Sequence, residues 1–486
     1  MNFYDRHDSF FDDDNFDNMD EKIRYYQKIL RSKNRSRLEL PDENVIESIV
    51  DYCISVERYR DGLEFCNIWL VNNPESADAY LKSAVIYSQL NRSSDALKHI
   101  NKALDIEPSM LEALLTKALI LEQTGELNHG LAIIDKILAY EPGNEDVLFR
   151  KAMLLQSAFK TEEALDILIY LENVDYQPEE VYQEIAHCYH MLYEFNKSTE
   201  YYQKSLDINP FDYLIWYNMG VMYGHKGANY KSIDCYKMSL ALKKDFTPAL
   251  FNLGNAYSAT SRLVEAISTY LELLTFAPGD IETMNNLAGT FADNKQYLSA
   301  IEYYTKVLNI DNTYHPAYFG RGFCYDALDN FEKALRDYDT ALVFTPESKN
   351  ILQQKADLLY NFGNVHSALE CYIRALEIDP NDEHSIFDVA FIYYELGDYD
   401  NAEMFAERLI DLSYSYADAW YLLGKIYARR DNTRKSAKCL SEAISLDSSK
   451  FEDFENEFPA LTNNYSKLNK IVQKNLKSGK GFFGRF

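Results

Sequence analysis

A period of 34 residues runs through most of this chain and limits its fold more than any other feature. One column of that period holds only Gly, Ala or Ser at twelve successive positions: Gly62, Ala96, Gly130, Ala164, Ser198, Ser232, Ala266, Ala300, Ala334, Ala368, Ala402 and Ser436. A second column, which passes through Gly254, is nearly as uniform. Self-similarity at a fixed period of about 20–50 residues is typical of repeat architectures, in which each unit packs only against its neighbours.

The stretch 247–280 shows what one unit contains. Apolar or small residues recur at the three- and four-residue spacing of a helical face from Leu250 to Tyr257, and again after a polar break from Ala266 to Leu274. A Pro-Gly pair then ends the second stretch. The pattern predicts two helices and a turn. Because the small columns leave room where the helices cross, the two helices can approach closely. Neither helix can bury its apolar stripe without neighbours.

The sequence resembles the tetratricopeptide repeat family. The spacing Trp420-x-x-Leu423-Gly424-x-x-Tyr427 is the signature of the family's first helix, and the 34-residue register continues without a slip from repeat to repeat. The resemblance implies an all-α fold, an α-α superhelical solenoid of about twelve 34-residue helix-turn-helix repeats with capping helices.

Five segments follow from this register. We expect an acidic disordered tail at 1–18, an N-terminal capping helix at 19–40, a solenoid of twelve repeats at 41–450, a C-terminal capping helix at 451–478 and a Gly/Phe tail at 479–486. Within the C-terminal part, an amphipathic and basic helix is expected at 466–478. A helix at each end would cover the open ends of the array.

Composition limits the classes of partner and the compartment. The 76 acidic and 49 basic residues give a formal net charge of −27, which excludes a general nucleic-acid binder because such proteins need a basic footprint. The seven cysteines are scattered through the chain, as expected of reduced thiols in a cytoplasmic protein. No apolar run approaches the ~18 residues of a membrane span, and no secretory signal is visible.

Catalysis, a cofactor and a metal site are not expected. No nucleophile with a base and no phosphate-binding loop stands out, and few residues lie outside the array. His187 and His190 stand three apart and share a helical face, but a metal would need three or four converging ligands. We interpret both as polar residues of a groove.

The candidate binding residues lie on the first helix of successive repeats, which the resemblance places on a concave groove. Asn218, Asn252 and Asn286 occupy one column in three consecutive repeats, with Asn255 and Asn285 beside them. An Asn amide both donates and accepts, so a row of amides can pair with an extended peptide backbone. The row resembles the asparagine ladder of long superhelical family members, such as the repeat region of the O-linked N-acetylglucosamine transferase. A solvated polar face is the alternative interpretation.

A neighbouring column is aromatic and includes Tyr217, Phe251 and Phe319. Exposed aromatic rows at such positions mark partner surfaces. The alternative is that these rings contact the preceding repeat.

The sequence therefore predicts a non-catalytic scaffold or adaptor that binds proteins or extended peptides in the concave groove of the superhelix. Basic segments are the partners that the net charge attracts most readily. Two alternatives remain: a chaperone or assembly factor for a client protein, and a regulatory subunit that attaches peripherally through the basic helix at 466–478. Membrane contact is expected only through that helix.

Overall fold

The computed structural model describes residues 19–30 and 41–457, and every regular element in these ranges is an α-helix, which confirms the all-α prediction. The first twelve helices are α1 (Met19–Leu30), α2 (Glu43–Ser55), α3 (Tyr59–Asn72), α4 (Ala77–Gln89), α5 (Ser93–Ile106), α6 (Leu111–Gln123), α7 (Leu127–Tyr140), α8 (Glu145–Ser157), α9 (Thr161–Asn173), α10 (Pro178–Met191), α11 (Phe195–Ile208) and α12 (Tyr213–His225).

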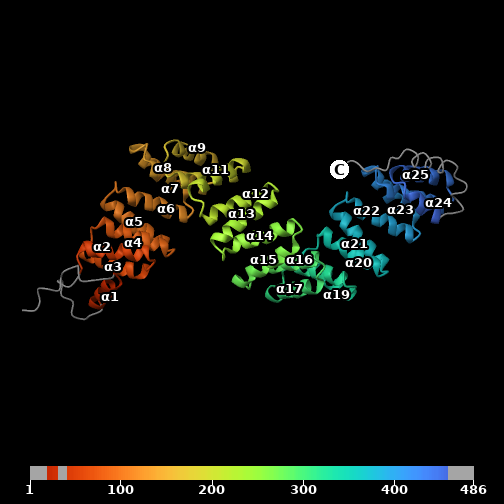
Figure 1. Cartoon of the computed structure of the whole chain (residues 1–486), viewed down its shortest axis with the longest axis horizontal. Helices are drawn as coiled ribbons and strands as arrows, with labels where there is room; N and C mark the ends of the chain where they lie inside the picture. Colours follow the sequence, from red (N-terminus) through yellow and green to blue (C-terminus); the bar gives the residue numbers. More distant parts are fainter. Residues whose placement is uncertain (1–18, 31–40, 458–486) are drawn as a thin grey trace, which may run out of the picture. The chain divides into compact units, whose positions relative to one another are not determined.

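The remaining helices are α13 (Asn229–Leu242), α14 (Thr247–Ala259), α15 (Leu263–Phe276), α16 (Ile281–Asp293), α17 (Tyr297–Ile310), α18 (His315–Asp326), α19 (Phe331–Phe344), α20 (Lys349–Asn361), α21 (Val365–Ile378), α22 (Glu383–Glu395), α23 (Tyr399–Leu412), α24 (Ala417–Arg429), α25 (Thr433–Leu446) and α26 (Lys450–Glu457). From α2 to α25 they alternate as the first helix (A, even numbers) and second helix (B, odd numbers) of successive repeats, as the 34-residue period predicts (Figure 1).

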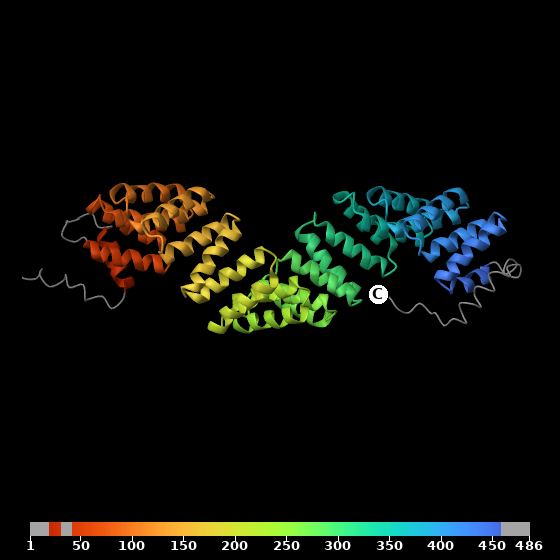
Figure 2. The same ribbon diagram turned by 90° about the horizontal axis from the view of Figure 1, so that it is seen from above.

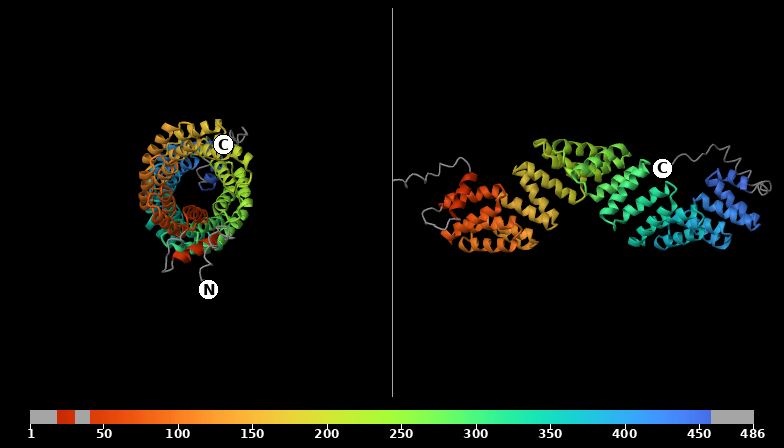
Figure 3. Two further views of the ribbon diagram at one scale, coloured as in Figure 1. Left: turned by 90° about the vertical axis from the view of Figure 1, so that its left-hand side faces the viewer. Right: turned by 90° about the horizontal axis from the view of Figure 1, so that it is seen from below.

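The helices form two compact units, 1–228 and 229–486, which are described separately. Unit 1 contains α1 to α12 and unit 2 contains α13 to α26. Within each unit, an A helix packs against the B helix of its own repeat, and that B helix packs against the A helix of the next repeat. The paired helices of unit 1 are visible in Figures 1 and 2, and the right-hand panel of Figure 3 shows those of unit 2.

Each turn between an A helix and its B helix contains one residue in the left-handed backbone region. These residues recur every 34 positions: Glu57, Asn91, Gly125, Phe159, Tyr193, Gly227, Ser261, Lys295, Asp329, Gly363, Gly397 and Asp431. Glycine takes this conformation without a steric cost, whereas for other residues the conformation is unfavourable in free energy. Since most of the twelve positions are not glycine, the turn conformation is imposed by the packing of the two helices.

Close approach of the two helices explains the small residues of the sequence period. In repeat 7, Gly254 of α14 lies against the buried ring of Tyr270 of α15, so that a Cβ at this position would stand 2.4 Å from the Cε1 atom of the ring. Gly322 meets Tyr338 of α19 in the same way, at 2.8 Å. The tyrosines that recur along the B helices are therefore core residues of their own repeats.

Helices outside the repeats lie at both ends of the described chain. Helix α1 packs on α2, with Ile23 fully buried and Asp20 paired with Arg58. Helix α26 packs on α25. The predictions for 1–18, 466–478 and 479–486, and the remaining parts of the two predicted capping helices, fall outside the described residues. In the part of the chain that the structure describes, no helix is both long and apolar enough to cross a bilayer.

Candidate peptide-binding face

The side chains predicted to bind a peptide in unit 2 come from A helices of consecutive repeats. We define the A-helix face of unit 2 as the side of its A helices that carries the columns of Phe251, Asn252, Asn255 and Ser258. Neighbouring A helices meet along this face: the hydroxyl oxygens of Ser258 and Thr290, on α14 and α16, are 3.2 Å apart. The face is thus shared by adjacent repeats.

Asn255 connects two repeats. Its Oδ1 atom accepts a hydrogen bond from the hydroxyl of Tyr270 at 2.6 Å and another from Nδ2 of Asn286 at 3.2 Å. The Tyr270 hydroxyl comes from the B helix of the same repeat, and the Asn286 amide comes from the next A helix. The oxygen of Asn255 is therefore already used inside the protein, and only its NH₂ group could pair with a ligand.

Asn285 and Asn286 keep hydrogen-bonding groups that other described residues do not use. Asn286 uses one N–H on Asn255, so its oxygen and its second N–H remain. Asn252 lies one helical turn before Asn255 and is partly buried. Asn285 is partly buried, and its Oδ1 atom is buried without a hydrogen-bond partner among the described residues. A buried acceptor without a donor is costly, so rotation of this amide toward a ligand would break no hydrogen bond of the oxygen.

The aromatic column includes rings that contact tyrosines of the B helices. Phe251 packs edge-on against Tyr270, with ring centroids 6.5 Å apart, and Phe319 lies 6.0 Å from Tyr338. Both contacts join an A helix to the B helix of the same repeat, whereas the alternative considered from the sequence was the preceding repeat. Both phenylalanines remain partly exposed, so one side of each ring is available to a ligand.

The amide row changes character after α16. The position that follows Asn255 by one repeat is Gly289, and the position that follows Asn286 is Gly320. The hydroxyl of Tyr304 approaches both glycines: a Cβ would lie 3.6 Å from it at Gly289 and 2.3 Å at Gly320. Tyr304 thus takes up the space of a side chain at Gly320, whereas Gly289 leaves room for a methyl group.

The predicted residues of unit 1 lie on α10 and α12. Tyr217 and Asn218 are partly buried on α12. The imidazole rings of His190 and His225 are 5.6 Å apart, and burial together with the nearby His225 and His187 lowers the pKa of His190. No group of three or more His, Cys, Asp or Glu side chains in the described ranges is arranged to hold a metal ion.

Comparison with known proteins agrees with the repeat pattern. Models of the tetratricopeptide repeat match residues 77–110, 179–212, 249–282, 281–314, 350–382 and 390–449. Most matches begin at the start of an A helix, and none disturbs the 34-residue register. The chain belongs to the tetratricopeptide repeat family.

Two curated tetratricopeptide relatives show how far the similarity extends. A TPR repeat-containing protein of Methanocaldococcus jannaschii is 24% identical over 212 residues, which are 40% of this chain and 37% of that protein. The BBSome complex member BBS4 of Bos taurus is 21% identical over 266 residues, or 54% of this chain and 51% of that protein. The chain therefore spans about half or less of the length of these relatives.

One solved structure aligns with about half of this chain. The C-terminal part of a TPR repeat-containing protein from Cytophaga hutchinsonii has a TM-score of 0.44 with this chain at 18% sequence identity. The alignment covers 50% of this chain and 99% of that one. We draw no functional assignment from a likeness at this level.

Further along the tetratricopeptide array of unit 2, the A-helix face carries carboxyl groups that the sequence analysis did not select. Burial, followed by the charge of Asp357, raises the pKa of Asp388 to about 6, and the same two causes raise the pKa of Asp326. Asp357 accepts a hydrogen bond from the hydroxyl of Tyr372. Asp388 stands in the same column as Asn252 and Asn286, so the ladder column could have revealed it.

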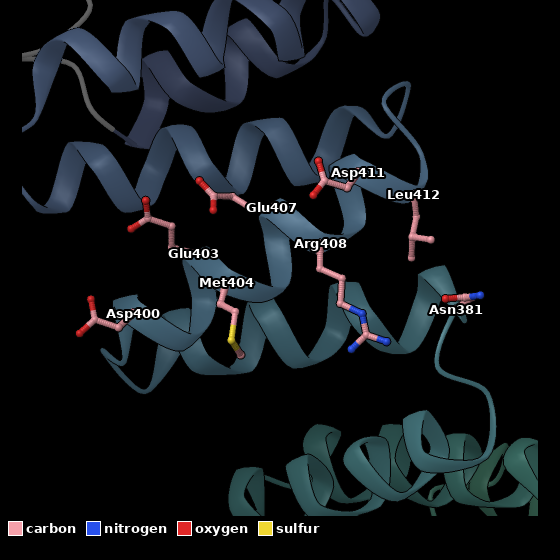
Figure 4. A pocket seen from close by; sticks show the side chains of 8 residues that line it. All are labelled: Asn381, Asp400, Glu403, Met404, Glu407, Arg408, Asp411 and Leu412. Carbon is pink, nitrogen blue, oxygen red and sulfur yellow. The ribbon is translucent and has the colours of Figure 1, made fainter.

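A separate acidic hollow lies on the B helices of this family member. It is lined along α23 by Asp400, Glu403, Met404, Glu407, Arg408, Asp411 and Leu412, with Asn381 from the turn between α21 and α22 (Figure 4). Arg430 pairs with both Asp400 and Glu403, and Arg408 donates to the carbonyl of Pro380. Because the hollow belongs to a B helix and several of its charges are paired internally, it is a weaker candidate than the A-helix face.

Proposed function

We propose that this tetratricopeptide repeat protein is a non-catalytic scaffold that binds extended segments of other proteins on the A-helix face of unit 2. One observation carries the proposal: the hydrogen bonds of Asn255 with Tyr270 and Asn286 fix two amides of successive A helices in place. A rigid row of donors and acceptors loses little conformational entropy when it pairs with a peptide backbone. Asn252, Asn285 and Asn286 are the residues that we assign to this contact.

Aromatic and charged groups extend the same surface. Phe251 and Phe319 are held by tyrosines behind them, which makes them rigid platforms for apolar side chains of a ligand. The raised pKa values of Asp326 and Asp388 indicate carboxyl groups that lack a sufficient counter-charge in the folded chain. A Lys or Arg of the bound segment would supply it. These groups support a partner with basic residues, in line with the net charge of −27.

A cytoplasmic location and an assembly role belong to the same proposal. All seven cysteines are buried and unpaired, which suits a reducing compartment. The curated relative in Bos taurus is named as a member of the BBSome complex, and membership of a multi-protein assembly fits a surface that holds segments of other chains. The charge makes nucleic acid an unfavourable partner.

Peptide selection on the full chain tests the proposal. Random peptides are selected by phage display, and the affinity of a selected peptide is measured by fluorescence anisotropy. Asn252→Ala combined with Asn286→Ala should weaken binding roughly ten-fold or more, since each lost amide removes about 0.5–1.5 kcal/mol of hydrogen bonding. Asn309→Ala, an exposed position on the B helix α17, is the matched control and should leave the affinity unchanged.

Methylation of the peptide backbone distinguishes hydrogen bonding to the main chain of the peptide from burial of its apolar side chains. If the amides hold the ligand's main chain, N-methylation at alternate peptide bonds should abolish binding even though every side chain is kept. Binding that survives both N-methylation and the double Asn variant, and instead follows the hydrophobicity of the peptide, would contradict the proposal. That result would favour a chaperone-like role.

A further inference from the structure

The last two repeats hold a carboxylate on the A-helix face. Glu457, at the end of α26, places its Oε2 atom 3.3 Å from Nζ of Lys425. Its Oε1 atom accepts a hydrogen bond from the hydroxyl of Tyr394 at 3.3 Å and lies 3.5 Å from the guanidinium of Arg429. Arg429 also donates from Nε to the hydroxyl oxygen of Tyr394 at 3.2 Å. Three donors from α22 and α24 thus converge on one carboxylate that comes from outside the repeats.

Aromatic rings hold the lysine of this cluster in place. The Lys425 side chain is only 12% exposed, and its Nζ lies over the rings of Tyr394 at 4.8 Å, Tyr421 at 5.4 Å and Phe391 at 5.7 Å from the ring centroids. Aromatic faces hold a cation and exclude water from it. A lysine in such a position loses little freedom when it binds an anion, unlike a lysine on an open surface.

The register places this cluster on the proposed binding surface. Lys425 occupies the same repeat position as Asn255, and Tyr394 the same position as Ser258. The other repeats have no Lys or Arg at the Lys425 position: their residues are Asp51, Val85, Leu119, Met153, His187, Val221, Asn255, Gly289, Phe323, Asp357 and Phe391. The cluster therefore puts a Lys at a position where no other repeat has a Lys or Arg, and Glu457 covers it.

We propose that Tyr394, Lys425 and Arg429 form a carboxylate-binding subsite, that Glu457 fills it as an internal ligand, and that its external ligand is an acidic side chain of an extended peptide. The inference rests on the proposed function, because an outside peptide must reach the A-helix face. Helix α26 is eight residues long and packs mainly on α25, so its contact with α22 and α24 depends on few groups. A partner that presents Asp or Glu there has to displace the carboxylate of Glu457.

The experiment uses the full chain and a blocked, fluorescein-labelled peptide with the sequence of residues 450–457, which supplies the same carboxylate in trans. A tethered group competes at an effective concentration of roughly 1 mM. For a peptide with an intrinsic Kd of about 0.1 mM, Glu457→Gln should therefore improve the apparent affinity roughly ten-fold over the unmodified chain. Glu452→Gln, an exposed acid on the same helix, is the matched control and should behave like the unmodified chain.

Two further arms test the chemistry of the subsite. In the Glu457→Gln background, Lys425→Met keeps most of the apolar stem and should abolish peptide binding. A peptide whose last Glu is replaced by Gln should bind at least ten-fold more weakly than the original. Equal binding by the Glu457→Gln and unmodified chains, or equal binding of the two peptides, would overturn the subsite.

The outcome is separable from that of the proposed function. If Glu457→Gln has no effect while the double Asn variant still loses its selected peptide, only the carboxylate subsite is wrong. If Glu457→Gln gains affinity as described and the Asn variants change nothing, the amide row of repeats 7 and 8 is wrong and the subsite stands.

Discussion

Two glycines in neighbouring A helices should respond to the same substitution with opposite signs. Gly254 of α14 and Gly289 of α16 both lie inside a helix. Gly→Ala at such a site gains about 1 kcal/mol from helix propensity when the added methyl group has room. At Gly289 the nearest atom to a Cβ is the Tyr304 hydroxyl at 3.6 Å, an ordinary contact. Gly289→Ala should therefore stabilise its repeat by roughly 0.5–1 kcal/mol.

At Gly254 the added methyl group has no room. Its Cβ would stand 2.4 Å from Cε1 of Tyr270, whereas carbon atoms need about 3.5 Å, so the ring would have to move by roughly 1 Å. The ring is 1% exposed and its hydroxyl is bonded to Asn255. Overpacking of this kind costs about 1–3 kcal/mol or more, which exceeds the gain in propensity. Gly254→Ala should therefore destabilise repeat 7 by about 1–2 kcal/mol net.

The measurement has to resolve single repeats, because the stability of a repeat array is distributed along it. Native-state hydrogen exchange followed by mass spectrometry reports the opening free energy of α14–α15 and α16–α17 separately. In a Tyr270→Leu background the clash is relieved, so Gly254→Ala should lose most of its cost, and the double-mutant cycle gives the coupling energy. If Gly254→Ala protects its repeat as Gly289→Ala does, the steric argument is refuted.

Three other predictions test buried charges and the turn. Asp388→Asn should stabilise the protein by roughly 1–2 kcal/mol at pH 7.5, because the carboxyl group has a raised pKa and its ionised form is unfavourable in the folded chain. The gain should shrink as the pH falls through about 6 toward 4, since the carboxyl group then becomes neutral. Denaturation at several pH values would show this change. Arg321→Ala should lower the free energy of unfolding by about 3 kcal/mol or more. The carboxylate of Asp337, whose side chain is only 6% exposed, would lose its two hydrogen bonds of 2.8 and 2.9 Å from the guanidinium of Arg321. Replacing both residues by apolar ones should cost less. Tyr193→Gly should raise the stability of its turn by roughly 1 kcal/mol, because the residue has φ 60° and is 81% exposed, so little packing is lost. A gain in hydrogen-exchange protection around residue 193 would confirm it.

The 34-residue period of the sequence was sufficient to predict the helices but not the side-chain contacts between them. Twelve small residues at fixed spacing predicted paired helices, and Gly254 against Tyr270 shows the physical reason. The same tyrosine column has unequal surroundings, however. Tyr270 and Tyr372 donate to Asn255 and Asp357, each fifteen residues earlier, whereas the hydroxyl of Tyr338 is buried without a hydrogen-bond partner in the described ranges. The residue fifteen positions before Tyr338 is Phe323, which has no side-chain acceptor. Whether a hydroxyl is satisfied therefore depends on the facing residue of the A helix and not on the tyrosine column itself.

The cluster around Glu457 shows a second limit of reasoning from columns. A periodic pattern draws attention to positions that repeat, such as Asn252 and Asn286, and treats Lys425 as a departure from them. The significance of Lys425 becomes visible only when a residue outside the period, Glu457, is found on it. In a repeat protein the columns encode the scaffold, which every repeat must build alike. Recognition of one partner requires the repeats to differ from one another. Binding groups are therefore better sought at positions where one repeat has a residue unlike the others in its column, and where neighbouring side chains hold that residue rigidly.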